Sequence, residues 1–166
     1  MQVLIAHGDA RARAAFAQVA ARVAAHGLEV IECGDGREAL QLLLAVEGPR
    51  LAVVDWDLPG LDGLEICRLV SQFDEPASPY VILLAGASQS LAEGLDAGAG
   101  DCVHIPIDAD ELRARIAAGR RLVERFAPGD DPTASLEAEL KAFGGDDEDD
   151  DDFAGGATLD SVLVAE

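Results

Sequence analysis

Asp55 is the residue of this chain whose type and position point most directly to chemistry. It follows an apolar run, 51–54, which is short enough to be a buried strand. Pro59 and Gly60 then indicate a turn, and Asp62 is a suitable N-cap for a helix that follows. A carboxylate at the carboxyl end of a buried strand lies where α/β folds place ligands and reactive groups. The sequence therefore predicts a functional carboxylate at the end of a strand.

The segments that must position Asp55 alternate between two periodicities. Five short apolar runs are typical of buried strands: 3–6, 28–32, 51–55, 80–84 and 102–105. The segments that follow them have the apolar spacing of helices: 9–26, 35–46, 62–73, 88–97 and 108–126. Five strands in such alternation imply an α/β fold with a doubly wound, five-stranded parallel sheet and helices on both faces.

The apolar spacing also predicts which side chains face the core. The helix residues expected to be buried are Phe16, Val19, Val23, Ala39, Leu42, Leu43, Val46, Leu64, Cys67, Val70, Leu112, Ile116 and Leu122. The three cysteines, Cys33, Cys67 and Cys102, are scattered and form no CxxC pair. We therefore expect them to be reduced thiols that fill the core, in a reducing compartment.

Several motifs occur in the same order as in one known family. Asp55 is followed by DLPGLDGLE at 57–65, and later come YVILLAGAS at 80–88, AGAGD at 97–101 and the step from Ile105 to Pro106. Over about residues 1–125 the chain resembles the receiver domains of bacterial response regulators. The resemblance implies the flavodoxin-like (βα)5 receiver fold with strand order 2-1-3-4-5. It also implies that Asp55 is equivalent to the phosphorylated aspartate.

The resemblance implies a magnesium site that this chain does not reproduce. In receivers, two consecutive acids at the end of the first strand bind Mg²⁺ together with the phosphoacceptor. Here those positions are His7 and Gly8, neither of which is a good oxygen ligand for this hard cation. Asp9 is one residue too late and is expected to begin a helix. Asp57 stands where receivers use a backbone carbonyl, which any residue provides.

Three further positions depart from the receiver pattern. The fourth strand of a receiver ends in a hydroxyl residue that binds the phosphoryl group, and here that position is Ala85, with Ser88 three residues further on. In receivers a lysine precedes the proline that follows the fifth strand, and here that position is Ile105, beside His104. The aromatic switch residue of the fifth strand is replaced by Cys102. Since phosphoryl transfer depends on neutralising the charge of the transferred group, Asp55 should be a poor acceptor.

These departures predict a degenerate receiver, or pseudo-receiver, in a cytoplasmic two-component signalling system. It would be no enzyme and would act by binding a protein partner, with weak or absent Mg²⁺ binding. The alternative is a working phosphorelay regulator, phosphorylated on Asp55 by a histidine kinase. A third reading makes the acidic tail the active part. Purely structural roles for Asp55 and His7 also stay open. Asp55 would then only accept backbone N–H bonds at the strand end. His7 would be either solvated or paired with Asp55 in place of a metal.

Charge is distributed very unevenly along the 166 residues, whose net charge is −20. Residues 1–126 contain 19 acidic and 11 basic side chains, whereas residues 127–166 contain 13 acidic and 1 basic. So acidic a chain should be repelled by nucleic acid and by anionic membranes. The N-terminus has no basic region before its short apolar run, and no apolar stretch approaches the length of a membrane span.

The composition predicts three parts: a receiver-like domain at 1–126, a linker at 127–145 with one short helical pattern, and an acidic tail at 146–166. Seven consecutive acids at 146–152 should keep that segment disordered. The apolar end, 158–166, is expected to dock on a partner or on the receiver itself. The oligomeric state does not follow from the sequence.

Overall fold

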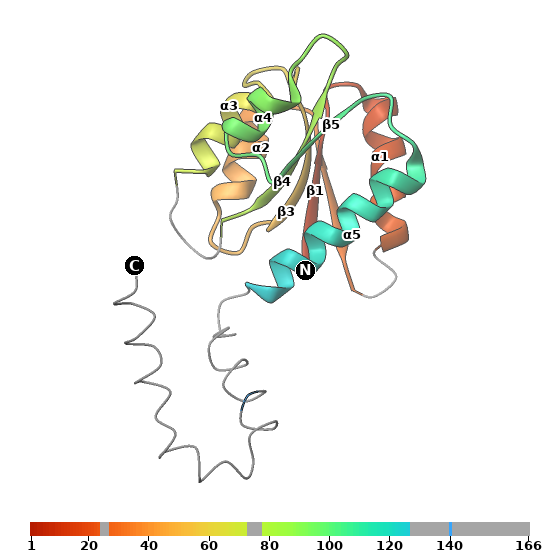
Figure 1. Ribbon diagram of the computed structural model, residues 1–166, viewed down its shortest axis with the longest axis vertical. Helices are drawn as coiled ribbons and strands as arrows, with labels where there is room; N and C mark the ends of the chain where they lie inside the picture. The colour runs from red at the N-terminus through yellow and green to blue at the C-terminus, as the bar shows by residue number, and fades with distance from the viewer. Residues whose placement is uncertain (24–26, 73–77, 127–139, 141–166) are drawn as a thin grey trace, which may run out of the picture. The chain divides into compact units, whose positions relative to one another are not determined.

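Five parallel strands form the centre of the protein in the computed structural model, which describes residues 1–23, 27–72, 78–126 and 140. The strands are β1 (Gln2–Ala6), β2 (Glu29–Cys33), β3 (Leu51–Asp55), β4 (Tyr80–Ala85) and β5 (Asp101–His104). Their order in the sheet is β2-β1-β3-β4-β5, which confirms the predicted doubly wound receiver topology (Figure 1).

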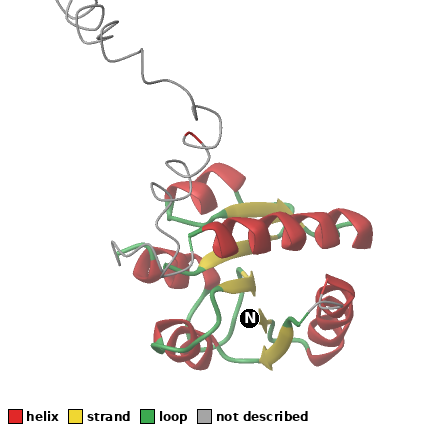
Figure 2. Ribbon diagram, turned by 90° about the horizontal axis from the view of Figure 1, so that it is seen from below, coloured by secondary structure: helices red, strands yellow, loops and turns green. Residues whose placement is uncertain are grey.

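Helices cover both faces of this sheet (Figures 1 and 2). They are α1 (Ala10–Val23), α2 (Gly36–Leu44), α3 (Gly63–Val70), α4 (Leu91–Asp96) and α5 (Ala109–Arg125). Three of them begin at side-chain caps: Asp35 accepts from the N–H of Arg37 at 2.7 Å, Asp62 from Glu65 at 2.8 Å and Ser90 from Glu93 at 3.3 Å. Asp62 is the predicted cap, whereas α4 begins after Ser90 and not at the predicted residue 88. Local capping therefore sets where the helices on one face begin.

The core consists of two apolar layers, one on each side of the sheet. Alternate strand residues point to opposite faces, so Leu4 and Val54 join the layer under α2, α3 and α4, while Ile5 and Val53 join the layer under α1 and α5. Cys33, Cys67 and Cys102 are free and buried in the first layer, as predicted. Burial raises the pKa of Cys67 to about 12, so this thiol stays protonated.

Two predicted core residues are wrong. Helix α2 ends at Leu44 and the next residue, Ala45, is extended, so Val46 lies beyond the helix with 90% of its surface exposed. Leu122 is 40% exposed because the buried stripe of α5 runs through Ile116 and Gly119 to Val123. At about 100° per residue, Val123 returns to the direction of Leu112 while Leu122 is turned well away from it.

The remaining expectations about chain organisation fall largely outside the described residues. The predicted end of the first helix, near 26, falls in a gap of the description, as do the acidic run 146–152 and the apolar end 158–166. The third helix ends at Val70, with Ser71 as its C-cap, which is short of the predicted end near 73. The partition into 1–126, 127–145 and 146–166 therefore stays a prediction. None of the helices in the described ranges combines the length and the apolar character needed to cross a membrane.

Candidate functional site

Asp55 lies at the carboxyl edge of the sheet, at the centre of the strand order. It is the last residue of β3, paired in register with Leu84 of β4, while the preceding Val54 is paired with Ala6 of β1. His7, which follows Ala6, therefore emerges at the same edge. The Asp55 side chain is buried, with 8% of the residue exposed. Strand pairing thus brings together two side chains that are 48 positions apart in the sequence.

His7 occupies the place beside Asp55 where receivers hold an acidic metal ligand. Its Nε2 is 3.7 Å from Asp55 Oδ2, a distance at which a protonated ring forms an ion pair, so the pairing that the sequence left open is present in the structure. The backbone N–H of Asp9 donates to His7 Nδ1 at 3.0 Å. Because Nδ1 accepts this bond, the proton of the neutral ring lies on Nε2 and faces the carboxylate. The ring also lies against Phe16, with centroids 5.7 Å apart.

The environment of Asp55 disfavours its negative charge. Burial raises the pKa of the Asp55 carboxyl above its ordinary value, and the nearby Asp57 carboxylate raises it further. His7 and backbone N–H groups, including that of Trp56, act in the opposite direction without outweighing burial. Because the surroundings stabilise even one negative charge poorly, they provide little positive charge to stabilise an added phosphoryl group.

The residues that follow β1 do not form a cage for magnesium. Gly8 has no side chain, and a Cβ built there would lie 3.0 Å from Pro59 Cδ, so the position is also narrow. Asp9 is exposed and its Oδ1 accepts from the N–H of Arg11 at 2.9 Å, which occupies it in the first turn of α1. Within the described ranges, no group of three or more His, Cys, Asp or Glu side chains is arranged to hold a metal ion. The donors present around Asp55 therefore do not fit Mg²⁺, which prefers an octahedron of oxygens.

The positions of the missing hydroxyl, cation and aromatic switch are filled by core residues. Ala85 at the end of β4 is fully buried, and its carbonyl accepts from the N–H of Ile105 at 2.8 Å. The Ile105 side chain packs into the layer under α1 and α5. Cys102 is buried in the opposite layer, and His104 is exposed at the sheet edge. None of these side chains supplies a positive charge or a hydroxyl at the place where the receiver pattern has one.

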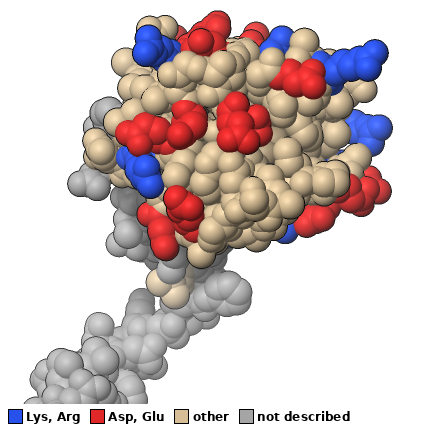
Figure 3. Space-filling model, turned by 90° about the horizontal axis from the view of Figure 1, so that it is seen from above, with Lys and Arg blue, Asp and Glu red and all other residues tan. Residues whose placement is uncertain are grey.

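Acidic side chains surround the site at this edge of the sheet. Asp9, Asp35, Asp57 and Asp62 each lie in a connection that follows a strand end. Figure 3 looks onto this side of the molecule and shows acidic residues across it, with arginines mainly toward the rim. Of these four carboxylates, Asp57 is the one that acts on Asp55, whose pKa it raises in addition to burial.

Two residues that contact members of the site, His7 and Asp57, could not be found by sequence reasoning. Arg13 reaches back from α1, where its Nη1 donates to the carbonyl of His7 at 2.9 Å and its Nε lies 3.7 Å from Glu32 Oε1. Gln89 follows β4, and its Nε2 donates to Asp57 Oδ1 at 3.1 Å. Both are long polar side chains for which the sequence predicts solvent exposure, and the contacts of Arg13 with Glu32 and of Gln89 with Asp57 join segments that are distant in the sequence.

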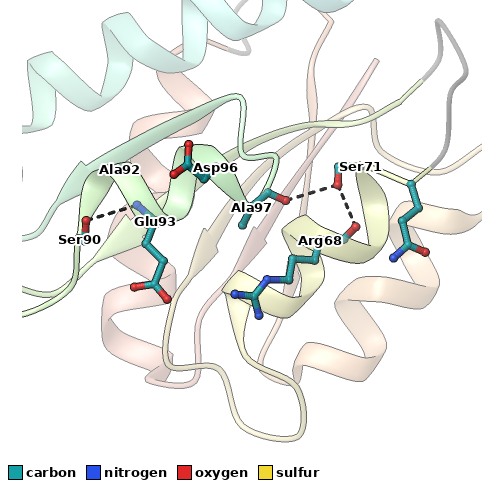
Figure 4. A pocket seen from close by; sticks show the side chains of 8 residues that line it. Arg68, Ser71, Ser90, Ala92, Glu93, Asp96 and Ala97 are labelled. Carbon is teal, nitrogen blue, oxygen red and sulfur yellow. Dashed lines mark hydrogen bonds between the residues drawn. The ribbon is translucent and has the colours of Figure 1, made fainter.

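A shallow groove lies away from Asp55, between the end of α3 and α4 (Figure 4). Its volume is about 650 Å³, and Arg68 lines one side of it while Glu93 and Asp96 line the other. Ser71 joins the two sides, since its Oγ donates to the carbonyls of Arg68 at 2.8 Å and Ala97 at 3.4 Å. The groove contains both signs of charge and no member of the predicted site.

Comparison with known proteins gives matches in sequence and in structure. Residues 3–117 match the model of the response regulator receiver domain. The chain is 41% identical over 108 residues to response regulator MprA of Mycolicibacterium vanbaalenii, covering 63% of this chain and 44% of that protein. It is 40% identical over 78 residues to response regulator RppA of Synechocystis, covering 47% and 33%. The chain thus spans less than half the length of these two relatives.

Solved structures agree with the sequence matches. The receiver domain of the Francisella response regulator 1452 superposes with a TM-score of 0.60 at 28% identity, covering 75% of this chain and 97% of that one. A CheY-like receiver domain protein from Methanospirillum hungatei, at 21% identity and a TM-score of 0.62 over 75% and 97%, shares the fold. The family match over residues 3–117, which is more than half of the chain, shows that the chain belongs to the response regulator receiver domain family.

Proposed function

We propose that this protein is a pseudo-receiver, a signalling protein that acts by binding another protein and does not depend on Mg²⁺-dependent phosphorylation of Asp55. The observation that carries the proposal is the pairing of His7 Nε2 with Asp55 Oδ2 at 3.7 Å, where a receiver has an acidic metal ligand. The imidazole N–H takes the place beside the carboxylate that a cation would need. The proposal assigns no catalytic residue and no resident metal to the chain.

Charge balance supports the same conclusion. A phosphoryl group on Asp55 would bring about −1.5 to −2 charges into the pocket. Burial already raises the pKa of the Asp55 carboxyl, which shows that a single charge is disfavoured there. Ala85 and Ile105 supply neither a hydrogen bond nor a positive charge to the added group. Phosphorylation should therefore be slow and its product poorly stabilised.

The partner is proposed to be a protein of a two-component pathway, either a histidine kinase or a downstream effector, in the cytoplasm. Receiver domains of this family contact such proteins, and the acidic composition disfavours nucleic acid and anionic membranes. The predicted tail, 146–166, would be an additional element for partner contact. An affinity pull-down with the full chain and a chain lacking 146–166 identifies the partner and the contribution of the tail.

A working phosphorelay regulator is the second candidate, because Asp55 itself is retained at the strand end. Incubation of the full chain with a small phosphodonor and Mg²⁺, followed by intact-mass measurement, separates the two. The pseudo-receiver should show no gain of a phosphoryl group under conditions that modify an ordinary receiver domain in the same tube. A stoichiometric gain that is lost in Asp55→Asn would establish the phosphorelay function instead.

A further inference from the structure

The connection between β4 and α4, residues 86–90, is fastened at its first residue. The N–H of Gly86 donates to Gln89 Oε1 at 2.7 Å, and the Gly86 carbonyl accepts from the N–H of Gln89 at 3.0 Å. That same carbonyl lies 3.0 Å from His104 Nδ1 of β5. Because a carbonyl can only accept, the proton of the His104 ring is on Nδ1. Gly86 is therefore held from its own loop and from the neighbouring strand.

The Gln89 side chain also reaches across the edge of the sheet. Its Nε2 donates to Asp57 Oδ1 at 3.1 Å, in the connection that follows β3 and two residues after Asp55. One half-buried carboxamide thus links the two connections that follow β3 and β4. These are the connections that border Asp55 on the side where a receiver has its hydroxyl residue, which here is Ala85.

A carboxamide is the side chain that can make both contacts at once. Its oxygen accepts the N–H of Gly86 while its nitrogen donates to the carboxylate of Asp57. An ionised glutamate in the same place could accept but not donate, and it would repel Asp57. The geometry therefore depends on the chemical type of Gln89 and not only on its length.

The bridge that Gln89 forms between Gly86 and Asp57 lies directly before the first turn of α4. Ser90 follows Gln89 and caps the helix, since its Oγ accepts from the N–H of Glu93 at 3.3 Å. Glu93 in turn borders the groove between α3 and α4. Where the bridge holds residue 89, the start of α4 and one wall of that groove take a defined position.

We propose that Gln89 is a positioning residue that bridges Gly86 and Asp57 and so holds the β4–α4 connection and the start of α4 in one arrangement without a phosphoryl group. The inference rests on the proposed function, because a receiver that works without phosphorylation needs another means of fixing this surface. The bridge replaces, with a contact inside the protein, the link that a hydroxyl residue at position 85 would make to a phosphoryl group.

The test measures amide hydrogen exchange by NMR on the full, unphosphorylated chain. Gln89→Ala should make the amide of Gly86 exchange about five to ten times faster, since the hydrogen bond that protects it is removed, and amides at 87–91 should follow. Ser88→Ala is the matched control, because Ser88 is exposed and adjacent, and it should leave these rates unchanged. Unchanged rates in Gln89→Ala would overturn the proposal.

A swapped pair tests the hydrogen bond itself. Gln89→Glu alone keeps an acceptor for the Gly86 N–H but has no donor for Asp57 and repels it, so at neutral pH the exchange rates should rise, by less than in Gln89→Ala. Adding Asp57→Asn reverses donor and acceptor: the new amide nitrogen at 57 can donate to the carboxylate at 89, which still accepts from Gly86. Recovery of slow exchange in the double variant supports the bridge. If the double variant has the melting temperature of the parent protein but its amides still exchange fast, the proposed bridge is wrong. This outcome can be read even where Gln89→Ala does not fold.

This experiment and the phosphodonor assay can fail separately. Slow exchange that depends on Gln89, together with stoichiometric phosphorylation of Asp55, would retain the bridge and reject the pseudo-receiver. Exchange that is independent of Gln89, together with no phosphorylation, would reject the bridge and retain the pseudo-receiver.

Discussion

Rebuilding the acidic pocket gives a quantitative test of the site. The double variant His7→Asp, Gly8→Asp places two carboxylates beside Asp55, which has a raised pKa through burial already. Like charges about 4 Å apart repel by about 1 kcal/mol in bulk water and about 4 kcal/mol near a protein surface. The pocket is partly open, so we expect the free energy of unfolding without metal to fall by about 1–3 kcal/mol. Pro59 must also shift slightly, since the new Cβ at position 8 lies 3.0 Å from its Cδ.

Magnesium should reverse this loss in the rebuilt variant alone. A ligand that binds only the folded state stabilises it by RT ln(1 + [L]/Kd), which is about 1.4 kcal/mol at ten times Kd. The wild-type protein should gain almost no stability from magnesium, because position 7 offers an imidazole and position 8, a glycine, offers no side-chain ligand. Cations attracted to the acidic run 146–152 should contribute little to the difference, provided that the run binds them equally in the folded and unfolded states.

The assay is urea unfolding followed by the fluorescence of Trp56, the single tryptophan, which is buried and next to Asp55. Titrations with MgCl₂ are matched in ionic strength with NaCl. His7→Asn, Gly8→Asn is the control of equal size without the added charge: it should show the steric part of the loss at Pro59 but neither the charge-dependent part nor the rescue. A magnesium-dependent gain of about 1 kcal/mol in the wild-type protein, abolished by Asp55→Asn, would refute the reasoning about the site. Absence of rescue in the rebuilt variant would refute the positional assignments.

Four further outcomes follow from the packing and the charges. The raised pKa of Asp55 means that its ionisation lowers stability, so Asp55→Asn should be more stable than wild type above the folded-state pKa. In urea titrations across pH this gap should close as pH falls from the folded-state pKa toward the unfolded value of about 3.9. Asp55→Ala, which also removes the acceptor of backbone N–H bonds, should be about 1 kcal/mol less stable than Asp55→Asn. Ile116→Ala should cost about 2–5 kcal/mol while Leu122→Ala on the same helix costs below about 1, and equal losses would contradict the observed face of α5. Gly94→Ala should cost about 1–3 kcal/mol, because its Cβ would lie 2.6 Å from Cys102 Sγ, and Cys102→Ala should relieve most of that loss.

Much of the fold was predictable because its signals are local. The run 51–54 is buried on both faces of the sheet, and such strands are apolar at every position, so it can be read without knowledge of its neighbours. Asp62 caps α3 through a bond to a residue three positions away, which is also a local property. The strand order is different in kind, since periodicity does not determine it and it followed from the resemblance to receiver domains.

The sequence predicted which residues belong to the candidate site but not how they contact one another. The motif around Asp55 locates the carboxylate, and aligned positions identify His7 as the replacement for an acid. What His7 does depends on the parallel pairing of β1 with β3, which sets its Nε2 at 3.7 Å from Asp55. The direction of its proton depends on the Asp9 N–H, which the first turn of α1 aims at Nδ1. Such a distance is a result of the folded sheet and is not encoded in spacing.

The sequence by itself determined the alternation of strands and helices, the carboxylate at a strand end and the absence of the receiver's usual acids, hydroxyl and lysine. These are properties of residue identity and short-range spacing. Only the tertiary structure decided the contacts between distant segments, such as the bridge from Gln89 to Asp57 and the turn of Leu122 away from the core. The physical reason is that a polar side chain or a helix end could contact many partners with similar energy. The packing of the sheet then brings only one of these partners within contact distance.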